Sequence, residues 1–140
     1  MLVSTRGRYA LRVMLELAQR PAGSFTPLPV IAEAQSVSEK YLESIVVLLS
    51  RAGLVDGVRG KGGGYRLTRT PDQYAVGEIL RLTEGTLAPV TCLEGEENTC
   101  PRAGHCRTLP MWEKLDSMIN DYLDSVSLAD LLRETDGSSQ

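Results

Sequence analysis

A glycine- and cation-rich segment at residues 56–64, DGVRGKGGG, most constrains how this chain can fold. It lies between two short runs of strand-forming residues, Leu54-Val55 and 65-YRLT-68, which predict a β-hairpin with this segment as its turn. The glycine run would suit a nucleotide phosphate only if it led into the N-terminus of a helix. Because it leads into a strand pattern instead, we expect no nucleotide site.

Three segments with apolar residues at helical spacing precede this hairpin: 5–19, 27–35 and roughly 38–52. Ser36 and Glu39 fit a capping box at the start of the third segment, and Gly53 lies where a left-handed C-terminal cap belongs. Three helices and a hairpin, with a tight turn between the second and third helices, are the order of a winged helix-turn-helix head. We therefore predict a mainly α chain with such a head over residues 1–75.

The rest of the chain predicts a long helix that the head cannot fully cover. A fourth helix is expected over 76–84, and the long C-terminal dimerisation helix over about 110–126. Its apolar residues follow steps of three or four: Met111, Leu115, Met118, Ile119, Tyr122 and Val126. Pairing with its twin in a homodimer would bury this surface, whereas packing back on the same chain is the alternative. This second unit spans residues 76–134, with a short last helix after Ser127, and a disordered tail is expected at 135–140.

All three cysteines of the chain lie in a polar loop at about residues 89–108: Cys92, Cys100 and Cys106. An odd number of thiols disfavours a disulfide framework, and their crowding indicates a single site for a soft metal or an iron–sulfur cluster. The C-x7-C-x5-C spacing lacks the paired knuckles of zinc fingers, so its long intervals suit a bulkier cluster better. Three idle thiols are the simpler alternative.

The residues themselves leave the fourth ligand of such a cluster open. His105 is the only histidine and lies in the loop, but it adjoins Cys106, and neighbouring side chains tend to diverge. The alternatives are an external ligand or an acidic side chain of the loop: Glu94, Glu96 or Glu97. The position of His105 also makes it a poor base for a nucleophilic cysteine, and no carboxylate pair stands out, so we expect no enzyme.

The net charge of −3 is divided unevenly along the chain. Residues 1–75 carry ten Lys/Arg and six Asp/Glu, a balance of +4, whereas residues 76–140 carry five and twelve, a balance of −7. A basic head and an acidic body are what a protein that binds double-stranded DNA would show, although chance clustering of surface charge gives the same sums. A dimer would suit a near-palindromic operator.

Candidate DNA contacts lie on the third helix, in the hairpin turn and on the first helix: Ser38, Glu39, Lys40, Tyr41, Glu43, Arg59, Lys61 and Arg8. Lys40 can contact a phosphate or a guanine, and Glu43 can accept a hydrogen bond from a cytosine amino group in the major groove. Arg59 and Lys61 lie among glycines that allow close approach, so an arginine there can enter a narrow minor groove. An ordinary solvated helix face is the alternative for any one of the helix residues.

No stretch of the sequence approaches the roughly 20 apolar residues that a membrane span needs. The N-terminal residues also lack the apolar run and the small-residue cleavage site of a signal peptide. We therefore expect no membrane partner and a cytoplasmic location, where thiols stay reduced.

Several of these stretches resemble the IscR-type family of winged-helix regulators, which includes the NsrR and RirA branches. The matching stretches are 5-TRGRYALRVMLELA-18, 38-SEKYLE-43, 53-GLVDGVRGKGGGYRLT-68, 76-VGEIL-80, the cysteine trio and 111-MW-112. The resemblance covers about residues 1–133. It implies a dimeric bacterial transcription factor whose cysteine loop binds an iron–sulfur cluster, and whose cluster occupancy changes DNA affinity or site choice.

The resemblance also implies roles for individual residues. The three cysteines would ligate the cluster, with [2Fe–2S] favoured and [4Fe–4S] open. Tyr41 and Glu43 would face the major groove, and Arg59 would serve the wing. Two positions depart from the family: Leu109 stands where IscR has a histidine ligand, and Arg8 stands where NsrR-type proteins can use an acidic ligand.

The sequence thus supports the hypothesis of a homodimeric DNA-binding repressor that senses iron–sulfur supply, or a redox signal, through its cluster. The rival hypothesis is a thiol- or metal-binding interaction module that uses a winged helix for protein contacts. Such a module would not require the basic wing that this sequence predicts.

Overall fold

The computed structural model describes residues 3–138, with side chains over residues 3–134, as six α-helices, two short 3₁₀ helices and one two-stranded sheet. Their order is α1 (Thr5–Ala18), α2 (Leu28–Gln35), α3 (Glu39–Arg51), β1 (Val55–Val58), β2 (Gly64–Leu67), η1 (Pro71–Gln73), α4 (Val76–Glu84), η2 (Thr91–Leu93), α5 (Leu109–Ser125) and α6 (Leu128–Ser138). This mainly helical order with one hairpin confirms the predicted fold class.

The end of the chain differs from the expectation of a disordered tail at 135–140. Helix α6 extends to Ser138, and residues 139–140 lie outside the described part. Ser127 and Asp130 cap the start of α6 reciprocally, since the Ser127 N–H donates to Asp130 Oδ2 at 2.9 Å and the Asp130 N–H donates to Ser127 Oγ at 3.0 Å. Over the residues described, no helix has both the length and the hydropathy to cross a bilayer.

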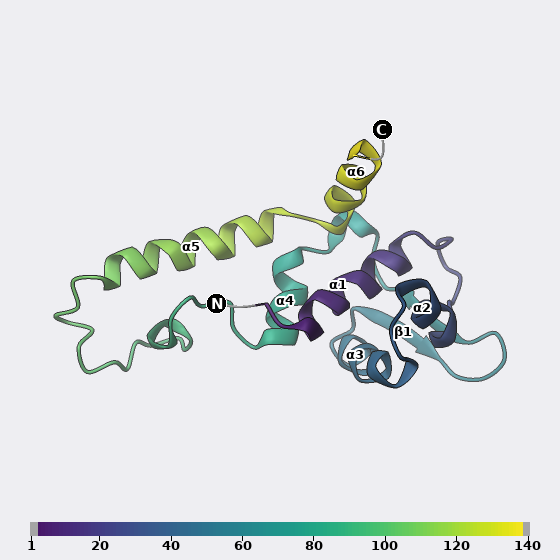
Figure 1. Ribbon diagram of the computed structural model, residues 1–140, viewed down its shortest axis with the longest axis horizontal. Helices are drawn as coiled ribbons and strands as arrows, with labels where there is room; N and C mark the ends of the chain where they lie inside the picture. Colours follow the sequence, from purple (N-terminus) through teal and green to yellow (C-terminus); the bar gives the residue numbers. More distant parts are fainter. Residues whose placement is uncertain (1–2, 139–140) are drawn as a thin grey trace.

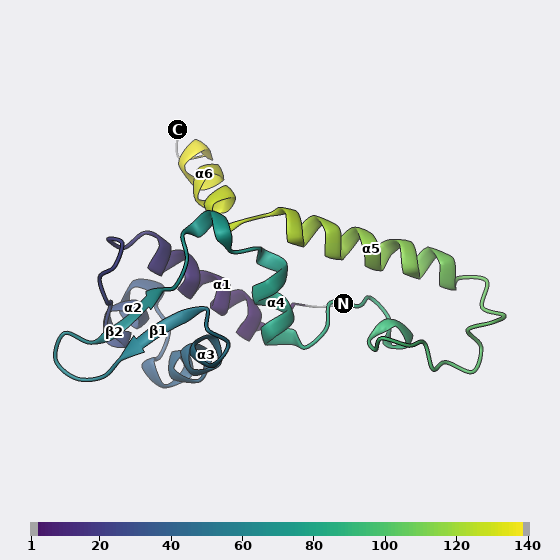
Figure 2. The same cartoon turned by 180° about the vertical axis from the view of Figure 1, so that it is seen from behind.

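The elements form a compact head and a projecting arm (Figure 1). Helices α1 to α4 and the hairpin gather in the head. The chain then leaves α4 through the cysteine loop and returns along α5, and we call residues 85–125 the arm. Figure 2 shows from behind that the hairpin turn, which with β1 and β2 forms the wing, projects from the opposite end of the molecule.

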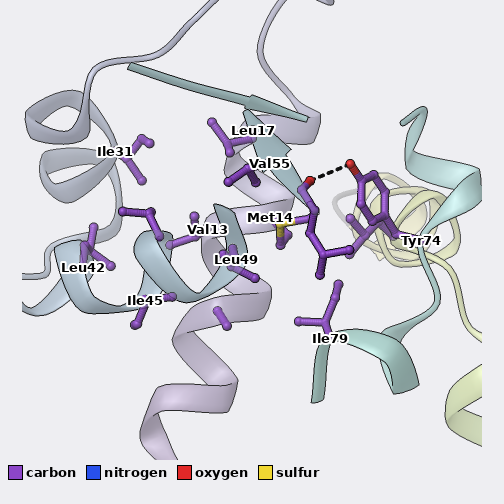
Figure 3. Close-up of a cluster of buried hydrophobic side chains, with 14 of the residues drawn as sticks. Val13, Met14, Leu17, Ile31, Leu42, Ile45, Leu49, Val55, Tyr74 and Ile79 are labelled. Carbon is purple, nitrogen blue, oxygen red and sulfur yellow. Dashed lines mark hydrogen bonds between the residues drawn. The ribbon is translucent and has the colours of Figure 1, made fainter. Parts of the chain in front are cut away.

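The hydrophobic core of the head is built by one face each of α1 and α3 (Figure 3). Val13 and Met14 of α1 and Ile45 of α3 are fully buried there. The same cluster contains Ile79 of α4 and Leu128 of α6. The packed unit therefore continues beyond residue 75, where the sequence placed the end of the head.

The turn between α2 and α3 is capped differently from the predicted capping box. Ser36 is the left-handed C-terminal cap of α2, with a φ of 54°, and Ser38 is the N-terminal cap of α3. The Ser38 side chain accepts a hydrogen bond from the Tyr41 N–H at 3.2 Å. The correction arises because Ser36 lies too early in the chain to reach the unpaired N–H groups of α3.

A single β-bridge ties the wing to the start of α2. Thr26 and Tyr65 exchange two backbone hydrogen bonds of 2.9 Å. Gly64 allows this approach, because its φ is +140° and a Cβ there would overlap the Thr26 carbonyl group. The wing is therefore held against the α2–α3 unit at its base while its turn projects into solvent.

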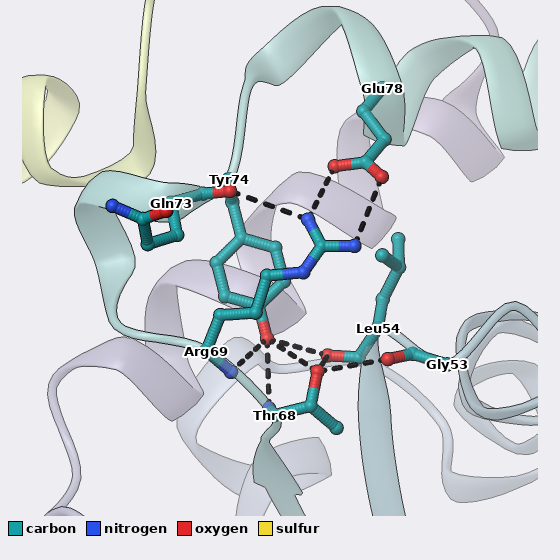
Figure 4. Close-up of polar contacts among 7 residues, drawn as sticks. All are labelled: Gly53, Leu54, Thr68, Arg69, Gln73, Tyr74 and Glu78. Atoms are coloured by element: carbon teal, nitrogen blue, oxygen red, sulfur yellow. Dashed lines mark hydrogen bonds and ion pairs between the residues drawn. The ribbon is translucent and has the colours of Figure 1, made fainter.

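A buried tyrosine joins the base of the wing to α4 (Figure 4). The Tyr74 hydroxyl donates to the Leu54 carbonyl at 2.8 Å and accepts from the Thr68 and Arg69 N–H groups at 2.8 and 3.0 Å. Arg69 also pairs with Glu78 of α4 at 2.7 Å. Since an unsatisfied buried polar group costs about 1–3 kcal/mol, this junction fixes the wing relative to α4.

Candidate nucleic-acid interface and cysteine loop

The solvent face of α3 carries the residues predicted to read DNA. Lys40 and Glu43 are exposed, as is Glu39 in the first turn. Ser38 is also exposed, but its hydroxyl is engaged as the cap of the helix. The carboxylate of Glu43 has no partner among the described residues, so it is available to accept a hydrogen bond from outside the chain.

Tyr41 differs from the other α3 candidates because it is half-buried. Its ring lies edge-on to the ring of Tyr9 on α1, with centroids 5.8 Å apart and an interplanar angle of 81°. The guanidinium of Arg12 lies over the Tyr9 ring, 4.5 Å from its centroid. Tyr41 therefore helps to set the position of α3 on α1, a packing role that the sequence did not predict.

The orientation of α2 relative to α1 is fixed by a polar network on the surface of the head. Arg12 donates to Gln35 Oε1 at 2.9 Å and also to the Gln35 carbonyl. The Gln35 amide donates to Glu16 Oε1 at 2.8 Å, and Arg20 donates to the other oxygen of Glu16 at 2.9 Å. The network holds the end of α2, and so the turn into α3, against α1.

The wing presents two unpaired cations. Arg59 and Lys61 are exposed in its turn, and neither is hydrogen-bonded or ion-paired within the part of the chain that the structure describes. Arg66 at its base is instead occupied by Asp56 at 3.6 Å and by the Gly23 carbonyl at 3.1 Å. Arg59 and Lys61 are thus the wing cations that remain free for a polyanion.

Arg8 lies in the first turns of α1 and is exposed to solvent. Its guanidinium donates to Thr5 Oγ1 at 3.2 Å. The arginine remains exposed and can reach a phosphate, and it offers no acceptor atom to a metal.

The three cysteines lie in the outward branch of the arm, where regular structure is sparse. Cys92 is in the 3₁₀ helix η2, and Cys100 and Cys106 lie in successive turns. All three are half-buried free thiols. Cys106 Sγ and Thr108 Oγ1 are hydrogen-bonded at 3.3 Å. Donation from the Thr108 hydroxyl, and then from the Thr108 backbone, stabilises the thiolate and lowers the pKa of the Cys106 thiol below its ordinary value.

The donor set of this loop fits a soft metal or an iron–sulfur cluster in chemistry, because thiols are the ligands that such groups prefer. In its present arrangement, the described part of the chain contains no group of three His, Cys, Asp or Glu side chains close enough to hold a metal ion. His105 is exposed, and it belongs to no such group among the described residues. Binding one metal ion or cluster through all three thiols would therefore require the loop to rearrange.

The start of the loop is tied to the N-terminus of α1. Glu84, the last residue of α4, accepts hydrogen bonds at Oε1 from the Ser4 hydroxyl at 2.6 Å and from the Ser4 N–H at 3.1 Å. Ser4 in turn caps α1 by accepting from the Gly7 N–H at 3.1 Å. The carboxylate also lies at the positive end of the α1 dipole. Glu84 thus joins the end of α4 to the N-terminus of α1.

The apolar residues of α5 are divided between two faces of that helix. Ile119 and Leu123 pack on the α4 residues Val76 and Leu80 in a second buried cluster. Next to this cluster, Arg81 of α4 donates to Asn120 Oδ1 at 2.9 Å and to Asp124 Oδ2 at 2.8 Å. The hydrogen bond with Asp124 raises the pKa of Arg81 above its ordinary value. One face of α5 is therefore covered by its own chain.

A second face of α5 carries large apolar side chains without a cover. These are Met111, Leu115, Met118 and Tyr122, with exposed fractions of 53, 38, 56 and 67 %. Their steps of three and four residues place them in one stripe along the helix. In the sequence, the apolar residues of both faces follow the same spacing of three and four residues. Only the structure shows which of them pack on α4 and which remain exposed to solvent.

Comparison with known proteins supplies the family context for this geometry. The model of the Rrf2 family, described as iron-dependent transcriptional regulators, matches residues 3–134. The HTH-type transcriptional regulator CymR of Bacillus subtilis is 39 % identical over 140 residues, covering 100 % of this chain and 96 % of CymR. The regulator IscR of Aliivibrio salmonicida is 39 % identical over 132 residues, covering 94 % of this chain and 77 % of IscR.

Two solved structures show the same fold. The structure of CymR, the global cysteine regulator of B. subtilis, matches with a TM-score of 0.76 and 40 % identity, over 94 % of this chain and 95 % of that one. The structure of IscR from T. potens matches with a TM-score of 0.77 and 37 % identity, over 100 % of this chain and 92 % of that one.

Proposed function

Since this chain belongs to the Rrf2 family of transcriptional regulators, we propose that it is a homodimeric, cytoplasmic repressor that binds DNA and senses iron–sulfur status through its cysteine loop. Its relatives are regulators, which confirms the expectation that it is not an enzyme. The observation that carries the sensing part of the proposal is the location of every cysteine in the one loop that joins the head to α5.

The DNA-binding part of the proposal assigns the major groove to α3 and the adjacent minor groove to the wing. Lys40 would contact a phosphate or a guanine, and Glu43 would accept a hydrogen bond from a cytosine amino group. Arg59 and Lys61 would contact the minor groove. The availability of these side chains supports the assignment, since each is exposed and none is paired within the described residues. A protein-interaction module would have no need to keep these cations free in a glycine-rich turn.

The sensing part of the proposal assigns the cluster to Cys92, Cys100 and Cys106, with [2Fe–2S] favoured over [4Fe–4S]. A bound cluster would make the loop sensitive both to the redox state of the cluster and to the availability of iron–sulfur clusters. The fourth position stays open to His105, to an acidic side chain or to an external ligand. The position of all three free thiols in one loop outside the head core supports the proposal.

Two connections would carry the state of the loop to the DNA-binding surface. At its start, Glu84 holds Ser4 and thereby the N-terminus of α1. At its end, the loop runs into α5, whose exposed stripe would meet the second protomer. A change in the loop would therefore shift the two heads relative to one another. A coupling free energy of about 1–3 kcal/mol would be enough for a regulatory switch.

Replacing Glu43 by alanine tests the DNA-reading role of α3. If Glu43 accepts from a cytosine amino group, Glu43→Ala will lose the preference for that base pair, which is about 1–3 kcal/mol of discrimination. The measurement is selection of duplexes from a random-sequence library by wild-type and variant proteins, followed by affinity measurements on single-base changes. Glu33→Ala on α2 removes another exposed carboxylate and serves as the control. An unchanged sequence preference in Glu43→Ala would remove α3 from the reading surface.

A second candidate function is favoured by the similarity to CymR. That relative is a global cysteine regulator, and this chain could respond to cysteine supply or thiol oxidation without a cluster. The observation in its favour is that the three thiols do not converge in the described structure. Iron and acid-labile sulfide analysis after anaerobic purification separates the two functions, because only the first predicts both elements in stoichiometric amounts.

A further inference from the structure

A groove runs between α3 and the wing. Its α3 side is lined by Val47, Ser50 and Arg51, and its wing side includes Val58, Arg59 and Tyr65. Each side of the groove therefore carries one arginine: Arg51 in the last turn of α3 and Arg59 in the turn of the wing. Tyr65, which also lines the groove, is half-buried, and the bridge to Thr26 fixes its backbone.

The helix side of the groove continues the face of α3 that was assigned to DNA. Glu43, Val47 and Arg51 follow one another at steps of four residues, so they share one side of the helix. All three are exposed, with Val47 at 37 %. The reading face thus begins near Lys40 and ends at the groove.

The arginines of the head fall into two groups by their partners. Arg20, Arg66 and Arg69 are each ion-paired with a carboxylate at 2.9, 3.6 and 2.7 Å. Arg51 and Arg59 have no carboxylate partner among the residues that the structure describes, and the same holds for Arg6, Arg8 and Arg12 on α1. Of these five, Arg51 and Arg59 line the groove. The groove therefore has positive charge on both sides that the chain itself leaves uncompensated.

The geometry of duplex DNA determines what can occupy such a groove. One phosphodiester strand separates a major groove from the neighbouring minor groove. If α3 lies in the first and Arg59 reaches the second, that strand must pass between the helix and the wing. We propose that the groove seats this strand, and that Arg51, which the sequence did not single out, clamps its phosphates together with the Ser50 hydroxyl. The inference rests on the DNA-binding function proposed above.

Arg51 would then be a positioning contact, not a base-reading one. Phosphate contacts set the register of a protein on the duplex but carry no sequence information. An alternative role is local, because a cation in the last turn of a helix interacts favourably with the helix dipole. That role affects the stability of the protein, whereas a phosphate contact affects the salt dependence of DNA binding.

The salt dependence of binding separates these two roles. We expect Arg51→Ala to weaken binding to two probes by similar factors: a duplex selected by the wild-type protein from a random-sequence library, and a mixed-sequence duplex. The slope of log K against log salt should fall by about 0.9 for each phosphate that the variant no longer neutralises, and so by about 1.8 for the two copies in a dimer. Arg51→Lys keeps the charge and should keep most of the slope.

Arg133→Ala is the control, since Arg133 is an exposed arginine on α6 that is ion-paired with Asp130 and does not line the groove. It should leave the salt slope unchanged. The thermal unfolding midpoint of each variant is measured alongside, and a fall in the midpoint of Arg51→Ala with a wild-type salt slope would assign Arg51 to the helix terminus and overturn the proposal.

The outcomes also separate this inference from the function on which it rests. If Arg59→Ala weakens binding while Arg51→Ala retains the wild-type affinity and slope, the protein binds DNA but the groove does not hold a phosphodiester strand. If the wild-type protein selects no duplex and shows no salt-dependent binding, both the DNA-binding function and the groove inference fail.

Discussion

Cys92→Ala will fail to assemble a cluster, so its visible absorbance, iron content and acid-labile sulfide will fall to background after anaerobic reconstitution. Three thiolates are the soft donors that the loop offers, and removing one leaves two, too few to hold an iron–sulfur cluster of either kind. Cys92 is the informative position because it lies in the short helix η2, on the side of the loop that follows α4.

Thr91→Ala is the control for this experiment. Thr91 is exposed, precedes Cys92 in the same 3₁₀ helix and carries no sulfur. It should assemble the wild-type amount of cluster. A Cys92→Ala protein that stays coloured, with full iron and sulfide, would show that the ligand assignment is wrong.

Charge introduced on the exposed stripe of α5 will separate the protomers. In Met118→Lys, a side chain that is 56 % exposed in the single chain becomes a cation that the dimer would have to bury. The head should fold normally, because Met118 belongs to neither buried cluster. Separation of the protomers removes the second half-site contact, so operator affinity should fall by about 10²–10⁴-fold.

The measurement is the mass of the protein in solution, by sedimentation or light scattering, together with operator affinity. Ser117→Lys adds the same charge one residue away, at an exposed position outside the apolar stripe. It should remain dimeric and bind the operator normally. A Met118→Lys protein that remains a dimer with wild-type affinity would contradict the assignment of this stripe to the second protomer.

Local signals in the sequence were sufficient for most of the head. The apolar period predicted α1, α3 and α4 to within two residues at each end, and Gly53 takes the left-handed cap conformation expected of it, with a φ of +76°. The position of the α3 cap was missed, because Ser36 and Ser38 are both plausible caps. The structure distinguishes them, because Ser38 accepts the hydrogen bond from the Tyr41 N–H while Ser36 is the left-handed cap of α2.

Tertiary contacts were beyond the reach of sequence patterns. The bridge between Thr26 and Tyr65 is a single pair of residues and leaves no periodic signal. The half-burial of Tyr41 depends on Tyr9, which lies on another helix. In the same way, period alone cannot show that Ile119 packs on α4 while Met118, its neighbour, remains exposed.

The candidate site was predicted as a set of residues but not as an arrangement. Spacing alone placed the three cysteines in one loop, and the structure confirms that they share it as free thiols. Sequence spacing could not show whether the thiols converge, because apolar periodicity does not determine loop turns such as those around Cys100 and Cys106. Arg51 was overlooked because a lone arginine at a helix end is common. Its position beside the wing, which depends on the fold, makes it a candidate contact.

The affinity of one selected operator duplex for the reconstituted protein and for the same preparation after removal of its iron tests the central claim most directly. We predict a difference of at least about 5-fold between the two states, corresponding to a coupling free energy of about 1–3 kcal/mol, and no difference for Cys92→Ala treated identically. Equal affinities of the loaded and stripped wild-type protein would contradict the account.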